Sequence, residues 1–230
     1  MKIAGICSLY EPLEYLENRL KNLQQCNLTD VHVFIADCSP KGIQNVVASV
    51  IKNFPNLPLS FLQLPKRETL YHTWNLLIQE ARRVGSPTYC TNVNVDDIYH
   101  PDYFQKMASF LDAKPNIQIA SCPWYITNKK GQIWPPERQG QSGLSQGSTI
   151  GHFPMWRTSL HDSIGYFDDR AVCIGDALFW SKIISRFGHG VIAEQPETLA
   201  CYLSHGKNLY YTAKGPHGEG GEAWDRGLNQ

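Results

Sequence analysis

Two adjacent carboxylates, Asp96 and Asp97, stand two residues after Asn94 at the end of a short apolar segment. Neighbouring carboxylates repel each other unless a cation lies beside them, and a hard divalent ion with oxygen ligands is the usual solution. Such an ion would bridge diphosphate oxygens and stabilise the charge on a departing nucleotide. The structural alternative is that Asp97 caps the helix expected to begin at Pro101.

A third carboxylate, Asp176, follows Gly175 at the start of a predicted helix that also carries Trp180. Aspartate at a helix N-terminus is often only a cap or a partner of the helix dipole. If this helix returns to the face that carries Asp96, the Asp176 carboxylate could instead serve as a general base. The sequence leaves both roles open.

Polar side chains also follow the first two predicted strands. Ser8, Tyr10 and Glu11 come after the first strand, and Asp37 ends the second. A carboxylate and an aromatic ring at such strand ends can hydrogen-bond to and stack on a nucleoside. Turn capping by Asp37 and core packing by Tyr10 are equally compatible with the local pattern.

The elements that must position these groups alternate through the first hundred residues. Strands are predicted over residues 3–8, 31–36, 59–64 and 88–93, and helices over 13–23, 43–54 and 70–84. Apolar residues at helical spacing between short apolar strands indicate an α/β fold with a Rossmann-like, doubly wound, mostly parallel mixed sheet flanked by helices. Such a sheet binds its ligands at the carboxyl ends of the strands.

The second half of the chain is less regular. The expected elements are a helix after residue 101, a long strand over 117–127 with a turn at 128–131, a helix over 176–187, and short strands at 190–193 and 198–203. Residues 135–151 are rich in Gly, Gln, Ser and Pro and are predicted to form a functional loop. The tail 214–230 shows no core-forming period.

Composition restricts the classes of function. The chain has 230 residues, 42% hydrophobic, which suits one domain. Lys plus Arg and Asp plus Glu both number 21, so no basic field exists to hold nucleic acid. We expect no transmembrane segment and no signal peptide. Seven cysteines without a C-x-x-C pair suit a cytoplasmic protein that touches a membrane at most peripherally. The sequence does not indicate an oligomeric state.

Motifs of several other enzyme classes are missing from the sequence. It contains no G-x-x-x-x-G-K-[ST] loop and no G-x-S-x-G elbow, and residues 188–190 lack the third glycine of a dinucleotide fingerprint. A nucleotidyltransferase would need a glycine-rich basic loop after the first strand, and residues 8–12 offer none. Kinase and hydrolase readings are therefore disfavoured.

Taken in order, the polar clusters resemble the motifs of family-2 glycosyltransferases of the GT-A fold, over residues 1–206. The similar segments are Ile6–Glu11 with Tyr15 and Leu16, Ala36–Ser39, Leu70–Asn75, Asn94–Pro101, Pro154–Asp168 and Gly175–Asp176. The resemblance implies a nucleotide-binding half, residues 1–100, and an acceptor-side half, residues 101–206. It leaves residues 207–230 as a glycine-rich tail that could act as a lid.

This resemblance implies an inverting glycosyltransferase that uses Mn²⁺ or Mg²⁺. The sugar would pass from a nucleoside-diphosphate donor, a UDP-sugar in preference to a GDP-sugar, to a hydroxyl of a saccharide or glycoconjugate. The product would belong to a surface polysaccharide or glycoconjugate.

The resemblance also assigns roles to individual residues. Donor binding would fall to Ser8, Tyr10, Glu11, Asp37, Asn75, Asn94 and Asp96. The metal ligands would be Asp96, Asp97 and His205, and Asp176 would be the catalytic base. His152, Trp156 and Trp180 would lie on the acceptor side. For Trp156 a place in the core, and for His205 plain surface exposure, are the alternatives.

Four positions depart from the family pattern, because Ala36, Trp74, Asn94 and Gly175 stand where charged residues are usual. Each replacement removes charge from the expected pocket. A non-catalytic nucleotide-sugar-binding or partner subunit is therefore the second hypothesis. If the chain is an enzyme, Arg67 or Lys66 could supply the cation that Trp74 does not.

Overall fold

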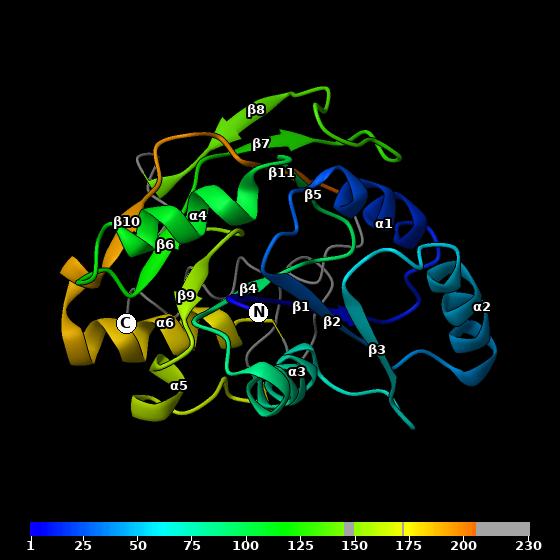
Figure 1. Cartoon of the computed structure of the whole chain (residues 1–230), viewed down its shortest axis with the longest axis horizontal. Helices are drawn as coiled ribbons and strands as arrows, with labels where there is room; N and C mark the ends of the chain where they lie inside the picture. The colour runs from blue at the N-terminus through cyan, green and yellow to red at the C-terminus, as the bar shows by residue number, and fades with distance from the viewer. Residues whose placement is uncertain (145–149, 172, 206–230) are drawn as a thin grey trace.

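A seven-stranded sheet with helices on both faces forms the centre of the computed structural model, which describes residues 1–144, 150–171 and 173–205 (Figure 1). The strand order is β10-β6-β9-β4-β1-β2-β3. This arrangement confirms the predicted α/β sandwich of helices around a mostly parallel sheet.

The first half of the chain follows the predicted alternation closely. Its strands are β1 (Ile3–Leu9), β2 (Val31–Asp37), β3 (Leu59–Gln63) and β4 (Tyr89–Asn92). Its helices are α1 (Leu16–Gln25), α2 (Lys41–Lys52) and α3 (Leu70–Gly85). The four strands pair in parallel, so their carboxyl ends lie along one edge of the sheet.

The order of the strands reverses at that edge, and the region between the loops that follow β1 and β4 is called the crevice. The chain passes from β1 outward to β2 and β3, then returns to place β4 on the other side of β1. Loops after β1 and β4 therefore diverge, and a doubly wound sheet binds ligands at such a switch point. The segments beginning at Tyr10 and at Val93 leave the sheet at this place.

Two apolar clusters bury the two faces of the sheet. Leu20 of α1 and Val47 of α2 pack on one face. Leu77 of α3 packs on the other, together with Phe179 of α6 (Gly175–Phe187). Both faces of β1 and β2 are therefore covered, which explains why these strands read as continuous apolar runs.

The second half departs from the predictions at one strand. The predicted strand over residues 117–127 is two strands, β6 (Ile119–Ser121) and β7 (Trp124–Thr127), which belong to different sheets. Pro123 lies between them and has no backbone N–H for a ladder. The strand breaks there, and the chain leaves the large sheet for the small one.

Three further elements complete the large sheet and its cover. β9 (Met155–Arg157) lies antiparallel between β4 and β6, and β10 (Ile192–Glu194) pairs in parallel with β6. A short 3-10 turn, η2 (His189–Val191), replaces the first part of the strand predicted at 190–193. The helices of this half are α4 (Tyr103–Asp112), α5 (Leu160–Ser163) and α6.

A second sheet of four strands lies beside the first, with the order β5-β11-β7-β8. It contains β5 (Ile98–Tyr99), β11 (Ala200–Leu203), β7 and β8 (Gly140–Ser142). β8 falls inside residues 135–151, which were predicted to be loop throughout, and pairs antiparallel with β7. The expected turn at 128–131 is thus the start of a longer connection.

Two expectations concern residues outside the described ranges. The proposed lid at 207–230 is one, and residues 145–149 of the predicted acceptor loop are the other. Within the described residues, no helix has both the length and the apolar content needed to cross a bilayer.

Candidate functional site

A carboxylate and an imidazole meet at the end of β4. Asp96 follows that strand and His205 follows β11, and His205 Nε2 lies 3.0 Å from Asp96 Oδ2. The two side chains are 23% and 10% exposed, so the pair is recessed yet reachable. Tyr15 stacks on the His205 ring with centroids 5.1 Å apart, which fixes the ring's orientation.

The Asp96–His205 pair has the spacing of two ligands of one metal ion. Ligand atoms on neighbouring corners of an octahedron, each about 2.1 Å from a Mg²⁺ ion, are about 3 Å apart. A carboxylate oxygen and an imidazole nitrogen also suit Mn²⁺. The described residues contain no group of three or more His, Cys, Asp or Glu side chains that could hold a metal ion. The pair therefore fits an ion whose other ligands are donor oxygens and water.

Asp97 is turned away from this pair. Its side chain is 3% exposed, Asn94 Nδ2 donates to its Oδ2 at 2.9 Å, and Arg19 donates to its backbone carbonyl at 3.1 Å. Burial, and to a smaller extent the charge of Asp96, hold the pKa of the Asp97 carboxyl well above its usual range. Of the two carboxylates predicted to ligate a metal, Asp96 is thus the more exposed, while Asp97 is buried and bonded to the Asn94 amide within the turn.

The end of β2 presents an acceptor atom that has no partner. Asp37 is fully buried, and its Oδ1 accepts from Ser39 N at 2.9 Å. Its Oδ2 is buried and receives no hydrogen bond from the described residues. Glu11, which has a left-handed φ of 49°, donates its N–H to Ser39 Oγ at 2.7 Å and so joins the β1 and β2 ends. Ser8 pairs with Ala36 just before these turns.

A cavity of about 470 Å³ opens beside the β2 end. Tyr10 lines it, is 40% exposed, and has the Arg67 guanidinium over its ring at 4.1 Å. Lys41 and Lys66 bring further positive charge to the same cavity. Tyr10 is therefore not a core residue. Arg67 lies in the same cavity, and it is the residue considered as a source of the cation that Trp74 does not supply.

The predicted base, Asp176, begins α6 and is held by α3. Tyr71 donates its hydroxyl to Asp176 Oδ1 at 2.9 Å, and the N–H of Ala177 donates to the same oxygen at 2.9 Å. Burial raises the pKa of the Asp176 carboxyl, and the hydrogen bond from Tyr71 opposes that rise. A carboxyl with a raised pKa is suited to accept a proton from a hydroxyl.

His152 lies exposed on the segment before β9 and within electrostatic reach of Asp96. Its ring stacks on Tyr202 at 4.3 Å between centroids, and its backbone carbonyl accepts from Asn92 Nδ2 at 3.0 Å. Although part of the residue is exposed, the protein groups packed around its ring displace hydrating water and lower the pKa of His152 to about 4, against the opposing charge of Asp96. An exposed, neutral aromatic surface results, as a sugar-stacking face requires.

Three other predicted site residues are structural. Trp156 is fully buried, and its indole Nε1 donates to His161 Nε2 at 3.0 Å. Trp180 is 4% exposed and packs edge-on against Trp156 with centroids 5.5 Å apart. Asn75 exchanges two hydrogen bonds with the backbone of Phe167, at 2.9 and 3.1 Å. The two tryptophans predicted on the acceptor side thus lie in the core, and the Asn75 amide predicted to bind the donor is hydrogen-bonded to the Phe167 backbone.

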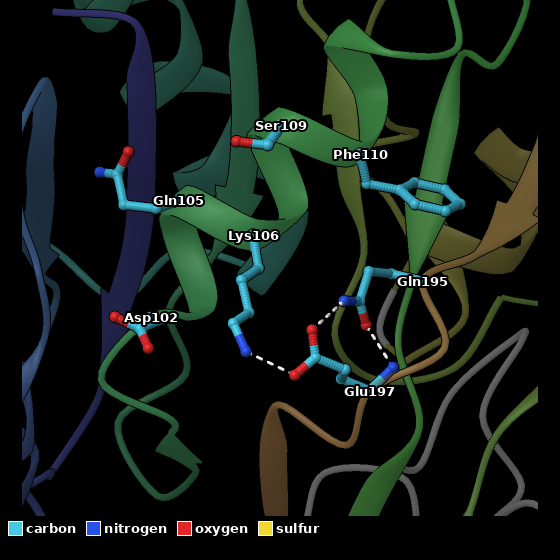
Figure 2. A pocket seen from close by; sticks show the side chains of 7 residues that line it. All are labelled: Asp102, Gln105, Lys106, Ser109, Phe110, Gln195 and Glu197. Carbon is cyan, nitrogen blue, oxygen red and sulfur yellow. Dashed lines mark hydrogen bonds and ion pairs between the residues drawn. The ribbon is translucent and has the colours of Figure 1, made fainter.

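A second hollow, of about 460 Å³, lies on the outer side of α4 (Figure 2). Figure 2 shows Lys106 and Gln195 both directed at Glu197, and Gln195 Nε2 donates to Glu197 Oε1 at 3.2 Å. The polar groups of this hollow satisfy one another, and none of the predicted site residues lines it. The crevice at the strand ends is therefore the better candidate site.

The family follows from a match that spans most of the sequence. The sequence profile described as glycosyl transferase family 2 matches residues 6–184. The chain belongs to this family. No curated protein sequence matches it. Membership in the family, the mixed sheet and the solved structures it resembles give the chain the GT-A fold.

Several solved glycosyltransferases share the fold at low sequence identity. S. aureus TarS 1–349 in complex with UDP-GlcNAc is 18% identical, with a TM-score of 0.71 over 94% of this chain and 63% of that chain. The mannosyltransferase PcManGT from Pyrobaculum calidifontis, with GDP-Man and Mn²⁺, is 14% identical, with a TM-score of 0.67 over 91% and 59%.

Glucosyl-3-phosphoglycerate synthase from Mycobacterium tuberculosis, with Mn²⁺, UDP and glucosyl-3-phosphoglycerate, is 11% identical, with a TM-score of 0.61 over 89% of this chain and 72% of that chain. The chain spans 38% of the longer TarS chain and 62% of TarS 1–349 with UDP. At these identities the likeness establishes the fold.

Sequence reasoning missed the residues that support the site from behind. Tyr71 holds Asp176, Tyr15 orients His205, and Tyr202 stacks under His152. Tyr15 stood within a quoted motif, so a signal for it existed. Tyr71 also lies within a quoted segment, Leu70–Asn75, but neither it nor Tyr202 was singled out, because each contacts its partner across elements far apart in sequence.

Proposed function

We propose that this chain is an inverting, metal-dependent glycosyltransferase that moves a sugar from a nucleoside-diphosphate donor to an acceptor hydroxyl. The observation that carries the proposal is the 3.0 Å approach of Asp96 Oδ2 and His205 Nε2 at the end of β4. Family membership supports the reaction class, and the crevice at the β1–β4 switch point supports the placement of the donor.

The nucleoside would lie in the cavity at the β2 end. The base would stack on Tyr10. Asp37 Oδ2 is buried behind Cys38 and Ser39, which line this cavity, and would accept a hydrogen bond from the base once donor binding uncovers it. Ser8, Glu11 and Asn94 would line the path toward the diphosphate. UDP is favoured over GDP because uracil has one N–H, flanked by carbonyls, which needs a single acceptor such as Asp37 Oδ2. The TarS and glucosyl-3-phosphoglycerate synthase structures hold uridine nucleotides.

Asp96 and His205 are the residues that would hold Mn²⁺ or Mg²⁺. When bound, the ion supplies charge neutralisation for the departing diphosphate. Arg67 and Lys66 line the cavity proposed for the nucleoside, so their positive charge would attract the anionic donor at that end rather than contact its diphosphate.

Asp176 is the proposed base. Its Oδ1 already accepts two hydrogen bonds, which leaves Oδ2 to take the proton of the acceptor hydroxyl. As that oxygen forms its bond to the anomeric carbon, the bond to the diphosphate oxygen breaks on the opposite face. The nucleoside diphosphate leaves with the electron pair, and the configuration inverts.

The acceptor is proposed to be a saccharide or glycoconjugate of the kind found in surface polysaccharides. The exposed His152 ring, stacked on Tyr202 near Asp96, is the aromatic face that would support it. We place the reaction in the cytoplasm, where the cysteines of this chain would stay reduced.

Titration calorimetry with UDP and GDP, with and without Mn²⁺, tests the donor site. The expected result is Mn²⁺-dependent binding of UDP that weakens about 100-fold in Asp96→Asn. Asp102→Asn makes the same chemical change at an exposed carboxylate in the outer hollow, and should leave binding unchanged. Equal UDP affinity in wild type and Asp96→Asn would contradict the site.

Donor consumption with a panel of acceptors tests the reaction. Asp176→Asn should lower transfer by about 10³-fold while UDP affinity stays within twofold, because an amide cannot accept the proton. If Asp176→Asn weakened donor binding and left turnover intact, the assignment of the base would be wrong. Donor binding without transfer or hydrolysis by the wild type would support the non-catalytic subunit instead.

A further inference from the structure

Gly175, the residue before the proposed base, stands where the family motif has an acidic side chain. In this structure the ring of Tyr71 fills that space. A Cβ placed on Gly175 would lie 2.5, 2.6 and 2.8 Å from Cδ2, Cγ and Cε2 of Tyr71. The backbone of Gly175 is not left-handed, so the ring, rather than the backbone conformation, requires glycine here.

The Tyr71 ring cannot move aside without disturbing the core. It is 2% exposed, Trp74 contacts it edge-on with centroids 5.4 Å apart, and Phe167 stacks on it at 5.9 Å. These neighbours direct the Tyr71 hydroxyl at Asp176 Oδ1, across 105 residues of sequence. The contact is therefore built by the packing of α3 against α6.

We propose that Tyr71 is the positioning residue of the catalytic base, and that Gly175 is required because the Tyr71 ring occupies its side-chain space. This inference rests on the proposed function of Asp176. It explains why the loss of an acidic residue at position 175 is compatible with an active site. A phenol from α3 takes over the support of the base, with no added negative charge beside it.

Few titratable groups face the Asp176 carboxylate. Tyr71 approaches from α3 and Cys173 from the segment before α6, and the backbone N–H groups of Asp176 and Ala177 also contact the carboxylate. A hydrogen bond to the charged form of a carboxyl favours ionisation. Removing the Tyr71 hydroxyl should therefore raise the pKa at which Asp176 becomes a competent base.

The first test is the pH dependence of transfer by Tyr71→Phe. We expect kcat to fall about 10- to 100-fold, because a displaced base loses its orientation, and KM for the donor to stay within twofold. The acidic limb of the kcat profile should move up by about one pH unit, as expected for a lost hydrogen bond to a charged group.

Tyr89→Phe is the matched control, because Tyr89 also donates to a carboxylate, Asp112 Oδ1, at 2.7 Å but lies at the opposite end of β4. It should change neither kcat nor the acidic limb. A Tyr71→Phe enzyme whose limb coincides with that of the wild type, or whose defect lies only in donor KM, would overturn the positioning role.

The second test needs no activity. Alanine is a better helix former than glycine, so Gly175→Ala at the start of α6 should stabilise the protein unless the ring excludes it. We expect Gly175→Ala to lower the melting temperature by several degrees in the wild type and to raise it in Tyr71→Ala. An equal effect of Gly175→Ala in both backgrounds would refute the steric link.

The two tests separate this inference from the proposed function. A wild-type protein that binds donor but transfers no sugar would defeat the proposed function, whatever the double-mutant cycle gives. An active wild type with an unshifted Tyr71→Phe profile defeats only the positioning role.

Discussion

Residues 1–100 and residues 101–205 place similar side chains in different environments. In the first half, Asp37 keeps an oxygen unpartnered among the described residues and Tyr10 is 40% exposed. In the second half, Trp156 and Trp180 are buried, and the Trp156 indole is bonded to His161. The residues of the family motifs thus fall into two groups. Some have exposed side chains or polar atoms without a partner among the described residues, and others are buried and hydrogen-bonded within the fold.

The largest expected difference between a more exposed and a buried motif residue is between the adjacent carboxylates Asp96 and Asp97. Asp96→Asn should lower Mn²⁺-dependent transfer by about 10³-fold, because the crevice loses its charged ligand. Asp97→Asn should keep its Mn²⁺ response, since this buried side chain contacts Asn94 rather than the crevice. Metal titrations of both variants provide the measurement. An equal loss of Mn²⁺ response in the two variants would show that both carboxylates serve the ion.

An aromatic from each half gives the next largest difference. Trp156→Ala should lower the free energy of unfolding by about 4 kcal/mol, because it empties a packed core site. Tyr10→Ala should change stability by less than about 0.5 kcal/mol and instead weaken UDP binding. Urea unfolding with calorimetry reads both quantities. A stable Trp156→Ala protein with impaired acceptor use would restore Trp156 to the acceptor side.

The buried imidazole beneath Trp156 makes stability depend on pH. His161 accepts from the indole and lies 2.9 Å from Gly165 O through Nδ1, and burial lowers its pKa to about 4. The unfolded chain binds a proton near pH 6.5, so this contribution is complete above that pH and is lost as the pH falls to 4.

The expected loss is roughly 3 kcal/mol. Urea unfolding between pH 4 and 7.5 measures it, and His161→Gln should give a flatter profile. The slope that remains reflects His32 and His152, whose pKa values are also lowered, and the opposite contributions of Asp97 and Asp176, whose pKa values are raised. A wild-type profile no steeper than that of His161→Gln would mean that His161 titrates freely in the folded protein.

The smallest expected effect concerns Asp37, at the end of the crevice proposed to bind the nucleoside of the donor. Asp37→Asn keeps an oxygen for Ser39 N but replaces the unpartnered acceptor by a donor. UDP affinity should fall about 10-fold, or about 1.4 kcal/mol, with an unchanged unfolding transition. If only the unfolding transition moved, Asp37 would be a turn residue, as the local pattern also allowed.

The first half was predictable because its signals are local. Each strand from β1 to β4 is a short apolar run followed by a polar turn, and each turn residue lies at the predicted edge of the sheet. Position within a parallel sheet then brought Asp37 and Asp96 to the same crevice side of the molecule without further information.

The rest depended on contacts that no local pattern encodes. The break at Pro123 sends β6 and β7 to different sheets, and apolar periodicity gave no sign of it. Asn75 stands at its motif position, yet the nitrogen and the oxygen of its side-chain amide are both hydrogen-bonded to the backbone of Phe167. Tyr71 fills the space beside Gly175 from another helix. The order of the motifs predicted the family, whereas the contacts that each motif residue makes could be seen only in the folded structure.

The reciprocal bonds between Asn75 and Phe167 have a consequence for assembly. They span 92 residues and fasten the approach to α6 onto α3. Both partners are buried, so these bonds should break only when the segment before α6 opens away from α3. Because Asn75 Oδ1 accepts a hydrogen bond from the Phe167 N–H, the exchange rate of that single amide hydrogen reports how often this contact, next to the proposed base, opens.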